Sequence, residues 1–83
     1  MWLDRFDKNS VVTGRKQTLR AIQSGKAKAV FIAKDAQEDL RAEIRSACQA
    51  AGTDCIEADS MRQLGAAAGI QVGASACAVL SST

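Results

Sequence analysis

At 83 residues the chain is long enough for one domain. It is too short to enclose a deep active site easily, because a domain of this size buries only about 60% of its unfolded surface. Hydrophobic residues make up 47% and charged residues 24%, as in ordinary folded domains, and histidine is absent. The lack of histidine removes the commonest general base and any Ser-His or Cys-His nucleophilic pair, so we expect no enzyme.

Positive charge is concentrated at the amino-terminal end of the chain. Residues 1–28 carry a net charge of +5 and residues 29–83 carry −3, which gives the net charge of +2. A positive face of this kind suits a polyanion such as nucleic acid. A solvated helix face with incidental charge would give the same distribution, so charge alone leaves both interpretations open.

The three cysteines, Cys48, Cys55 and Cys77, are widely spaced and have apolar neighbours. No C-x-x-C pair occurs, so the sequence indicates neither a metal site nor a thioredoxin-type motif. We expect small buried side chains in a reducing cytosol. The first residues lack the apolar core of a signal peptide and no stretch is long enough to span a membrane, so we expect a cytoplasmic protein without a membrane partner.

Apolar periodicity and turn residues divide the chain into alternating strands and helices. This alternation predicts the α/β class, with helices on both faces of a small sheet, in one domain whose ordered core spans about residues 11–80. The expected elements are one or two helical turns at 3–8, a strand at 11–12, a helix at 15–24, a strand at 29–33, a helix at 36–51, a strand at 53–57, a helix at 61–68, a loop at 70–75 and a strand at 76–80.

Two capping boxes mark helix starts in the second half of the chain. Asp35 with Glu38 is expected to cap the helix at 36–51, and Ser60 with Gln63 the following helix. A catalytic role for Asp35 finds no support, since no acid–base partner is evident in the sequence.

The start of the first long helix has the chemistry of an anion site. Gly14 allows close backbone approach, and the first-turn N–H groups and the positive end of the helix dipole point outward. Arg15, Lys16 and Arg20 supply charge for phosphates, and Lys16 and Gln17 can bond purine edges. An ordinary helix start with exposed basic residues is the alternative. The Walker and dinucleotide-binding glycine patterns are absent, so we expect no nucleotide cofactor.

Two further segments contain candidate functional residues. The first is the pair Lys34 and Asp35, which follows the central strand. The loop that precedes the last strand is apolar, although connecting turns are usually polar, so it could pack against an exposed nucleotide or fold back onto the core. Its residues are Ile70, Gln71, Val72, Gly73, Ala74 and Ser75.

The chain resembles bacterial members of the ribosomal L-seven-Ae / L-thirty-e family in three runs: G-R-K-Q-T-L-R-A-I-x-x-G-K-A, V-F-I-A-K-D-A and S-M-R-Q-L-G-A-A-A-G-I-Q-V-G-A-S-A. The resemblance covers roughly residues 11–80. It implies a three-layer α/β/α sandwich with a mixed sheet. It also implies a ribosomal-type protein that binds kink-turn or kink-turn-like RNA, in which a sharp bend lies beside tandem sheared G·A pairs.

The resemblance also implies roles for individual residues. Archaeal members have Asn-Glu where this chain has Lys16 and Gln17, and glutamine offers only one neutral acceptor for the N–H donors of guanine. The implied contacts are Gly14, Lys16 and Gln17 against the guanines, Arg20 on a phosphate, Asp35 orienting basic side chains, and residues 70–75 against the extruded nucleotide.

Two other classes of function remain open. The same fold is used by protein-interaction modules, for which binding would be insensitive to salt. Some RNA methyltransferases carry a similar domain ahead of a catalytic one, so the chain could be the detached RNA-binding domain of a modifying enzyme. Of these classes we favour the RNA-binding protein, with structured RNA such as ribosomal RNA as its partner, and we expect a monomer.

Overall fold

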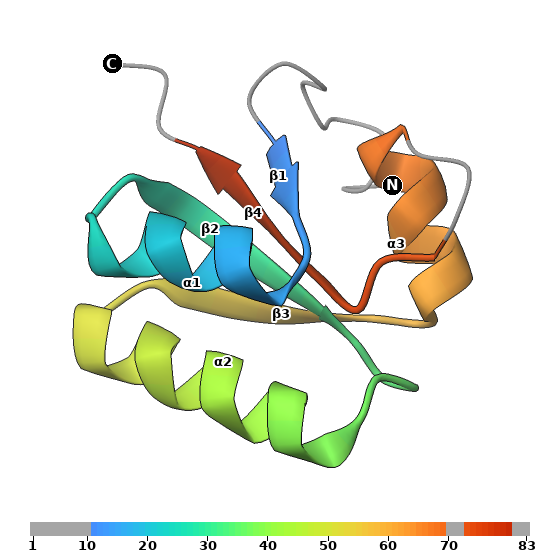
Figure 1. The fold of residues 1–83 in the computed structure, drawn as a ribbon, viewed down its shortest axis with the longest axis horizontal. Coiled ribbons are helices and arrows are strands. Elements are labelled where there is room, and N and C mark those ends of the chain that lie inside the picture. The colour runs from blue at the N-terminus through green and yellow to red at the C-terminus, as the bar shows by residue number, and fades with distance from the viewer. Residues whose placement is uncertain (1–10, 70–72, 81–83) are drawn as a thin grey trace.

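The computed structural model describes residues 11–69 and 73–80, and its strands and helices alternate as expected (Figure 1). The helical turns expected at 3–8 lie outside these residues. No helix in the described ranges is long and apolar enough to cross a membrane. The elements are β1 (Val11–Thr13), α1 (Arg15–Gln23), β2 (Ala27–Ala33), α2 (Glu38–Ala51), β3 (Asp54–Ala58), α3 (Met61–Ala68) and β4 (Ala76–Leu80).

The described strands form one mixed sheet in the order β1-β4-β2-β3. Strand β4 is antiparallel to both of its neighbours, whereas β2 and β3 are parallel. In this register Thr13 is paired with Cys77, and Ile32 with Ala76. At one end of the sheet, the last residues of β1 and β2 therefore lie beside the first residues of β4. This arrangement brings together the three segments that the sequence singles out.

Helices cover both faces of this sheet, which confirms the three-layer α/β/α sandwich (Figure 1). Val30 and Ile32 of β2 pack with Ile44 under α1 and α2. Phe31, between them in sequence, points to the opposite face and packs with Leu64 of α3. The central strand is an unbroken apolar run because successive side chains are buried on opposite faces.

The cysteines behave largely as the sequence predicts. Cys48 and Cys77 are buried, and Cys55 is half-buried beside Cys48. Burial raises the pKa of the Cys48 and Cys77 thiols to about 12. Both are therefore protonated, unreactive core side chains at neutral pH.

One of the two predicted capping boxes is wrong. Helix α2 begins at Glu38 with Gln37 as its N-cap, and no side chain of residues 11–69 or 73–80 caps it. Asp35 lies two residues too early and instead accepts a hydrogen bond from the backbone N–H of Met61, at 2.7 Å. The Ser60 cap is confirmed, since its hydroxyl accepts the N–H of Gln63 at 3.1 Å.

The buried face of α1 contains one polar side chain, Thr18, which is 0% exposed. Its hydroxyl has no hydrogen-bond partner in the described part of the chain. We expect Thr18→Val to raise the free energy of unfolding by roughly 1 kcal/mol, because valine has a similar shape and removes an unpaired buried polar group. Urea unfolding measures this difference. The control, Thr18→Ser, keeps the hydroxyl and deletes a methyl group, so it should destabilise. A valine variant less stable than the wild type would contradict the prediction.

Candidate functional site

Backbone hydrogen bonds fix the three candidate segments side by side. The N–H of Gly14 donates to the carbonyl of Ala76 at 2.9 Å, which ties the start of α1 to the start of β4. The N–H of Ala33 donates to the carbonyl of Ser75, also at 2.9 Å, which ties the end of β2 to the end of the loop. The candidate site is therefore a continuous surface at the end of the sheet where β1 and β2 end and β4 begins.

Gly14 adopts a conformation that favours glycine strongly, with φ 94° and ψ 162°. A Cβ added there would meet no atom within 4 Å among the described residues, so the backbone angle and not packing requires glycine. No side chain in the described part of the chain caps α1, and its first turn contains no acidic residue. The first-turn N–H groups and the positive end of the helix dipole thus face an open approach, as anion binding requires.

Lys16, Gln17 and Arg20 project from α1 as exposed side chains. None of them has an ion-pair or hydrogen-bond partner within the described ranges. Lys34, on the neighbouring turn, is 4.0 Å from Asp59 in a loose surface pair. The two cations and the amide on α1 are therefore available to a ligand.

Arg15 differs from its neighbours because it is paired with Glu43 of α2. Its Nε lies 2.5 Å from Oε1 and its Nη2 lies 3.0 Å from Oε2, which is a two-pronged contact. The hydrogen bond raises the pKa of Arg15 and lowers the pKa of Glu43. The sequence suggested a free phosphate ligand at Arg15. Its partner lies 28 residues away, at a spacing that carries no local signal.

The Arg15–Glu43 pair makes a prediction about acid stability. The pKa of Glu43 is lowered in the folded protein, so its stabilising effect is present above the unfolded pKa and is lost as pH falls through the folded pKa. Glu43→Gln should therefore destabilise slightly at neutral pH and by less at about pH 3, below the usual pKa of a glutamate, as the carboxylate takes up its proton. Urea midpoints at both pH values measure this. The control is Asp54→Asn, since Asp54 is exposed at the beginning of β3, away from a helix start, and has no ion pair in the described chain. An equal loss at both pH values would contradict the prediction.

Asp35 has a structural role that the sequence did not reveal. The resemblance assigns it the orientation of basic side chains, whereas its carboxylate is hydrogen-bonded to the N–H of Met61. This bond fixes the turn after β2 against the first residue of α3. A shallow pocket with a volume of about 310 Å³ opens beside it, lined by Asp35, Gln37, Leu40, Met61 and Ser75.

The described end of the apolar loop is packed against α3. The N–H of Ala74 donates to the carbonyl of Met61 at 2.9 Å, and a Cβ at Gly73 would come within 3.3 Å of that carbonyl. Ala74 is only 4% exposed, so its side chain belongs to the core and not to the binding surface, as a correction to the sequence prediction. Gly73 and Ser75 remain accessible, and Ile70, Gln71 and Val72 lie outside the described residues.

Comparison with known proteins establishes the family. Residues 4–83 match the family model described as the Ribosomal protein L7Ae/L30e/S12e/Gadd45 family, and the chain belongs to that family. A Bacillus pumilus protein named RNA-binding protein is 41% identical over 71 residues, which are 86% of this chain and 87% of that protein. RNA-binding protein YbxF of Geobacillus stearothermophilus is 41% identical over 84% of this chain and 85% of its own length. The large ribosomal subunit protein eL8 of Halobacterium salinarum is 33% identical over 89% of this chain and 62% of its length.

Solved structures confirm the fold. A Bacillus halodurans protein of unknown function superposes with a TM-score of 0.81 and 20% identity, over 89% of this chain and 74% of that one. A 15.5 kDa RNA-binding protein of Giardia lamblia gives a TM-score of 0.77 at 23% identity, over 88% of this chain and 62% of that one. At 20–23% identity, the similarity to these structures shows a shared backbone fold and nothing further.

Proposed function

We propose that this chain is a non-catalytic RNA-binding protein that recognises kink-turn or kink-turn-like RNA. The observation that carries the proposal is the start of α1, where Gly14 leaves an open approach and the cations Lys16 and Arg20 are unpaired within the described chain. Relatives at 41% identity are named RNA-binding proteins, which supports the same class of ligand.

The chemistry of α1 suits the edges of guanines beside a sharp bend. The N–H groups of the first turn and the helix dipole attract phosphate or carbonyl oxygens. Lys16 can donate to the O6 and N7 atoms of guanine, and the Gln17 amide both donates and accepts. Arg20, about one turn further along the same helix, lies where it can hold a phosphate of the same strand.

The pocket beside Asp35 suits a nucleotide turned out of the stack. Leu40 and Met61 provide apolar walls for the face of a base, while Asp35 and Gln37 provide polar groups for its edge. Its volume of about 310 Å³ lies at the lower end of the range for small-molecule sites, which suits one nucleotide. The pocket adjoins Ser75, so it is continuous with the loop that the sequence singled out.

The test compares a short kink-turn RNA with a matched duplex in which Watson–Crick pairs replace the G·A pairs. Fluorescence anisotropy at about 50 and 200 mM salt measures both affinities. We expect tight binding to the kink-turn alone, weakening with salt as counterions are released. Equal, salt-sensitive binding to both RNAs would leave a general basic RNA binder. Binding to neither would favour a protein-interaction module.

A further inference from the structure

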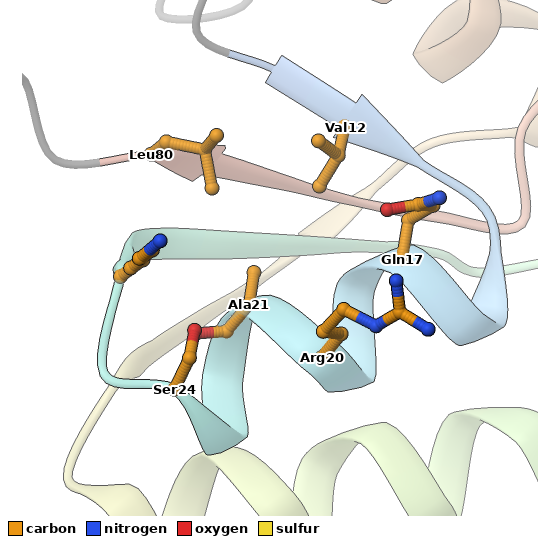
Figure 2. A pocket seen from close by; sticks show the side chains of 7 residues that line it. Val12, Gln17, Arg20, Ala21, Ser24 and Leu80 are labelled. Carbon is orange, nitrogen blue, oxygen red and sulfur yellow. The ribbon is translucent and has the colours of Figure 1, made fainter.

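A second concave surface lies along α1, between this helix and strands β1 and β4 (Figure 2). Val12 of β1 and Leu80 of β4 point toward Ala21 of α1 across it (Figure 2). We call this surface the α1–β1 groove. It has a volume of about 240 Å³, and its lining residues are Val12, Gln17, Arg20, Ala21, Ser24, Lys26 and Leu80.

Among the described residues, the lining combines an apolar floor with positive charge and contains no acidic residue. Arg20 and Lys26 have no ion pair in the described chain, whereas Arg15 is held by Glu43 and Arg41 by Glu57. Ser24 is already engaged, since its hydroxyl donates to the carbonyl of Ala21 at 3.2 Å. Two free cations beside an apolar floor match a ligand that has an apolar face and a negative charge.

The groove is continuous with the proposed RNA surface. Gln17 and Arg20 belong to both, because they lie on the flank of α1 that runs from the helix start toward Ser24. Ser24 lies seven positions after Gln17, which is about 10 Å along the helix axis. A strand that leaves the start of α1 in this direction enters the groove.

We propose that the α1–β1 groove binds an unpaired nucleotide of the RNA strand that continues beyond the kink-turn. The base lies on Val12, Ala21 and Leu80, and its flanking phosphates lie against Arg20 and Lys26. A volume of about 240 Å³, below the roughly 300 Å³ at which drug-sized sites begin, suits one base. This inference rests on the proposed function and extends the contact surface beyond the kink itself.

The experiment measures how much an overhang adds to affinity. A blunt kink-turn RNA is compared with the same RNA carrying a short single-stranded extension at the 5′ end or at the 3′ end. For the wild type, one of the two extensions should tighten binding at least about fivefold, the lower limit expected for one stacked base. Lys26→Ala should abolish most of this gain while still binding the blunt RNA.

Lys28→Ala is the matched control. Lys28 carries the same charge as Lys26 and lies two residues after it, but its side chain does not line the groove. It should keep the gain from the extension. The inference is overturned if the wild type binds blunt RNA but gains nothing from either extension, or if the two lysine variants lose the gain equally. In both cases the proposed function stands. If the wild type does not bind the blunt RNA, the proposed function itself fails and the groove inference falls with it.

Discussion

Alanine at Lys16 or at Gln17 is expected to weaken binding of kink-turn RNA by about 1–3 kcal/mol, which is roughly 5- to 150-fold in Kd. Both side chains are exposed beside the open backbone of Gly14, and neither has a partner in the described chain that would compete with a base edge. Anisotropy titrations of the two single variants and the double variant at one salt concentration measure the effect.

The control for this prediction is Lys28→Ala, because Lys28 is exposed near the beginning of β2, at the opposite end of the sheet from the start of α1. It removes one positive charge, as Lys16→Ala does, and should change affinity much less. Lys16→Ala and Gln17→Ala should also differ in the salt dependence of their RNA binding. Lys16→Ala should also reduce the salt dependence if the ammonium group touches a phosphate, whereas Gln17→Ala should leave it unchanged. Unchanged affinity in both single variants would remove these residues from the binding site.

Ile44→Ala is expected to lower the free energy of unfolding by about 2–5 kcal/mol. Ile44 is 0% exposed and packs with Ile22 of α1 and Ile32 of β2, so truncation leaves a cavity under the helix that carries the site. Urea unfolding measures the change. Gln49→Ala, on the exposed side of the same helix, is the control and should stay within about 0.5 kcal/mol of the wild type. A loss below about 1 kcal/mol at Ile44 would contradict the packing described here.

The elements of the fold were predictable from local patterns, and the errors at their ends have local causes. The strand expected at 53–57 is shifted by one residue to Asp54–Ala58. Gly52 ends α2 in a left-handed conformation, and the N–H of Thr53 then donates to the carbonyl of Cys48 at 2.9 Å. Thr53 is thereby used to close the helix, so strand pairing begins one residue later.

Strand β2 is longer than the apolar run suggested. It begins at Ala27 and contains the exposed Lys28, at a register irregularity between Ala27 and Ala29. A lysine breaks an apolar pattern although the backbone can continue in the sheet. Strand pairing with β4, and not hydrophobicity, therefore sets the beginning of β2.

The residues of the candidate site were predictable only where a single short segment of the sequence contains all the residues that define the feature. Gly14 and the cations of α1 are visible as a short motif, because a helix start requires a particular backbone and leaves its N–H groups open. The contact of Arg15 with Glu43 and that of Asp35 with Met61 join residues 28 and 26 positions apart. Such contacts depend on how α2 and α3 pack on the sheet, and no spacing in the sequence encodes them. The Asp35 capping box failed for this reason, since a long-range backbone donor competes with the local one.

The most direct test of the proposed surface is an NMR titration of the labelled protein with kink-turn RNA, followed through its backbone amides. We expect the largest shifts in three ranges that are far apart in the sequence and adjacent in the fold, namely 14–17, 34–35 and 73–75. Small shifts are expected around Arg41 and Arg45, which are paired with Glu57 on the opposite side of α2 from Arg15. If the RNA instead shifts the residues around Glu57 and leaves the start of α1 unchanged, the three segments do not form the binding surface.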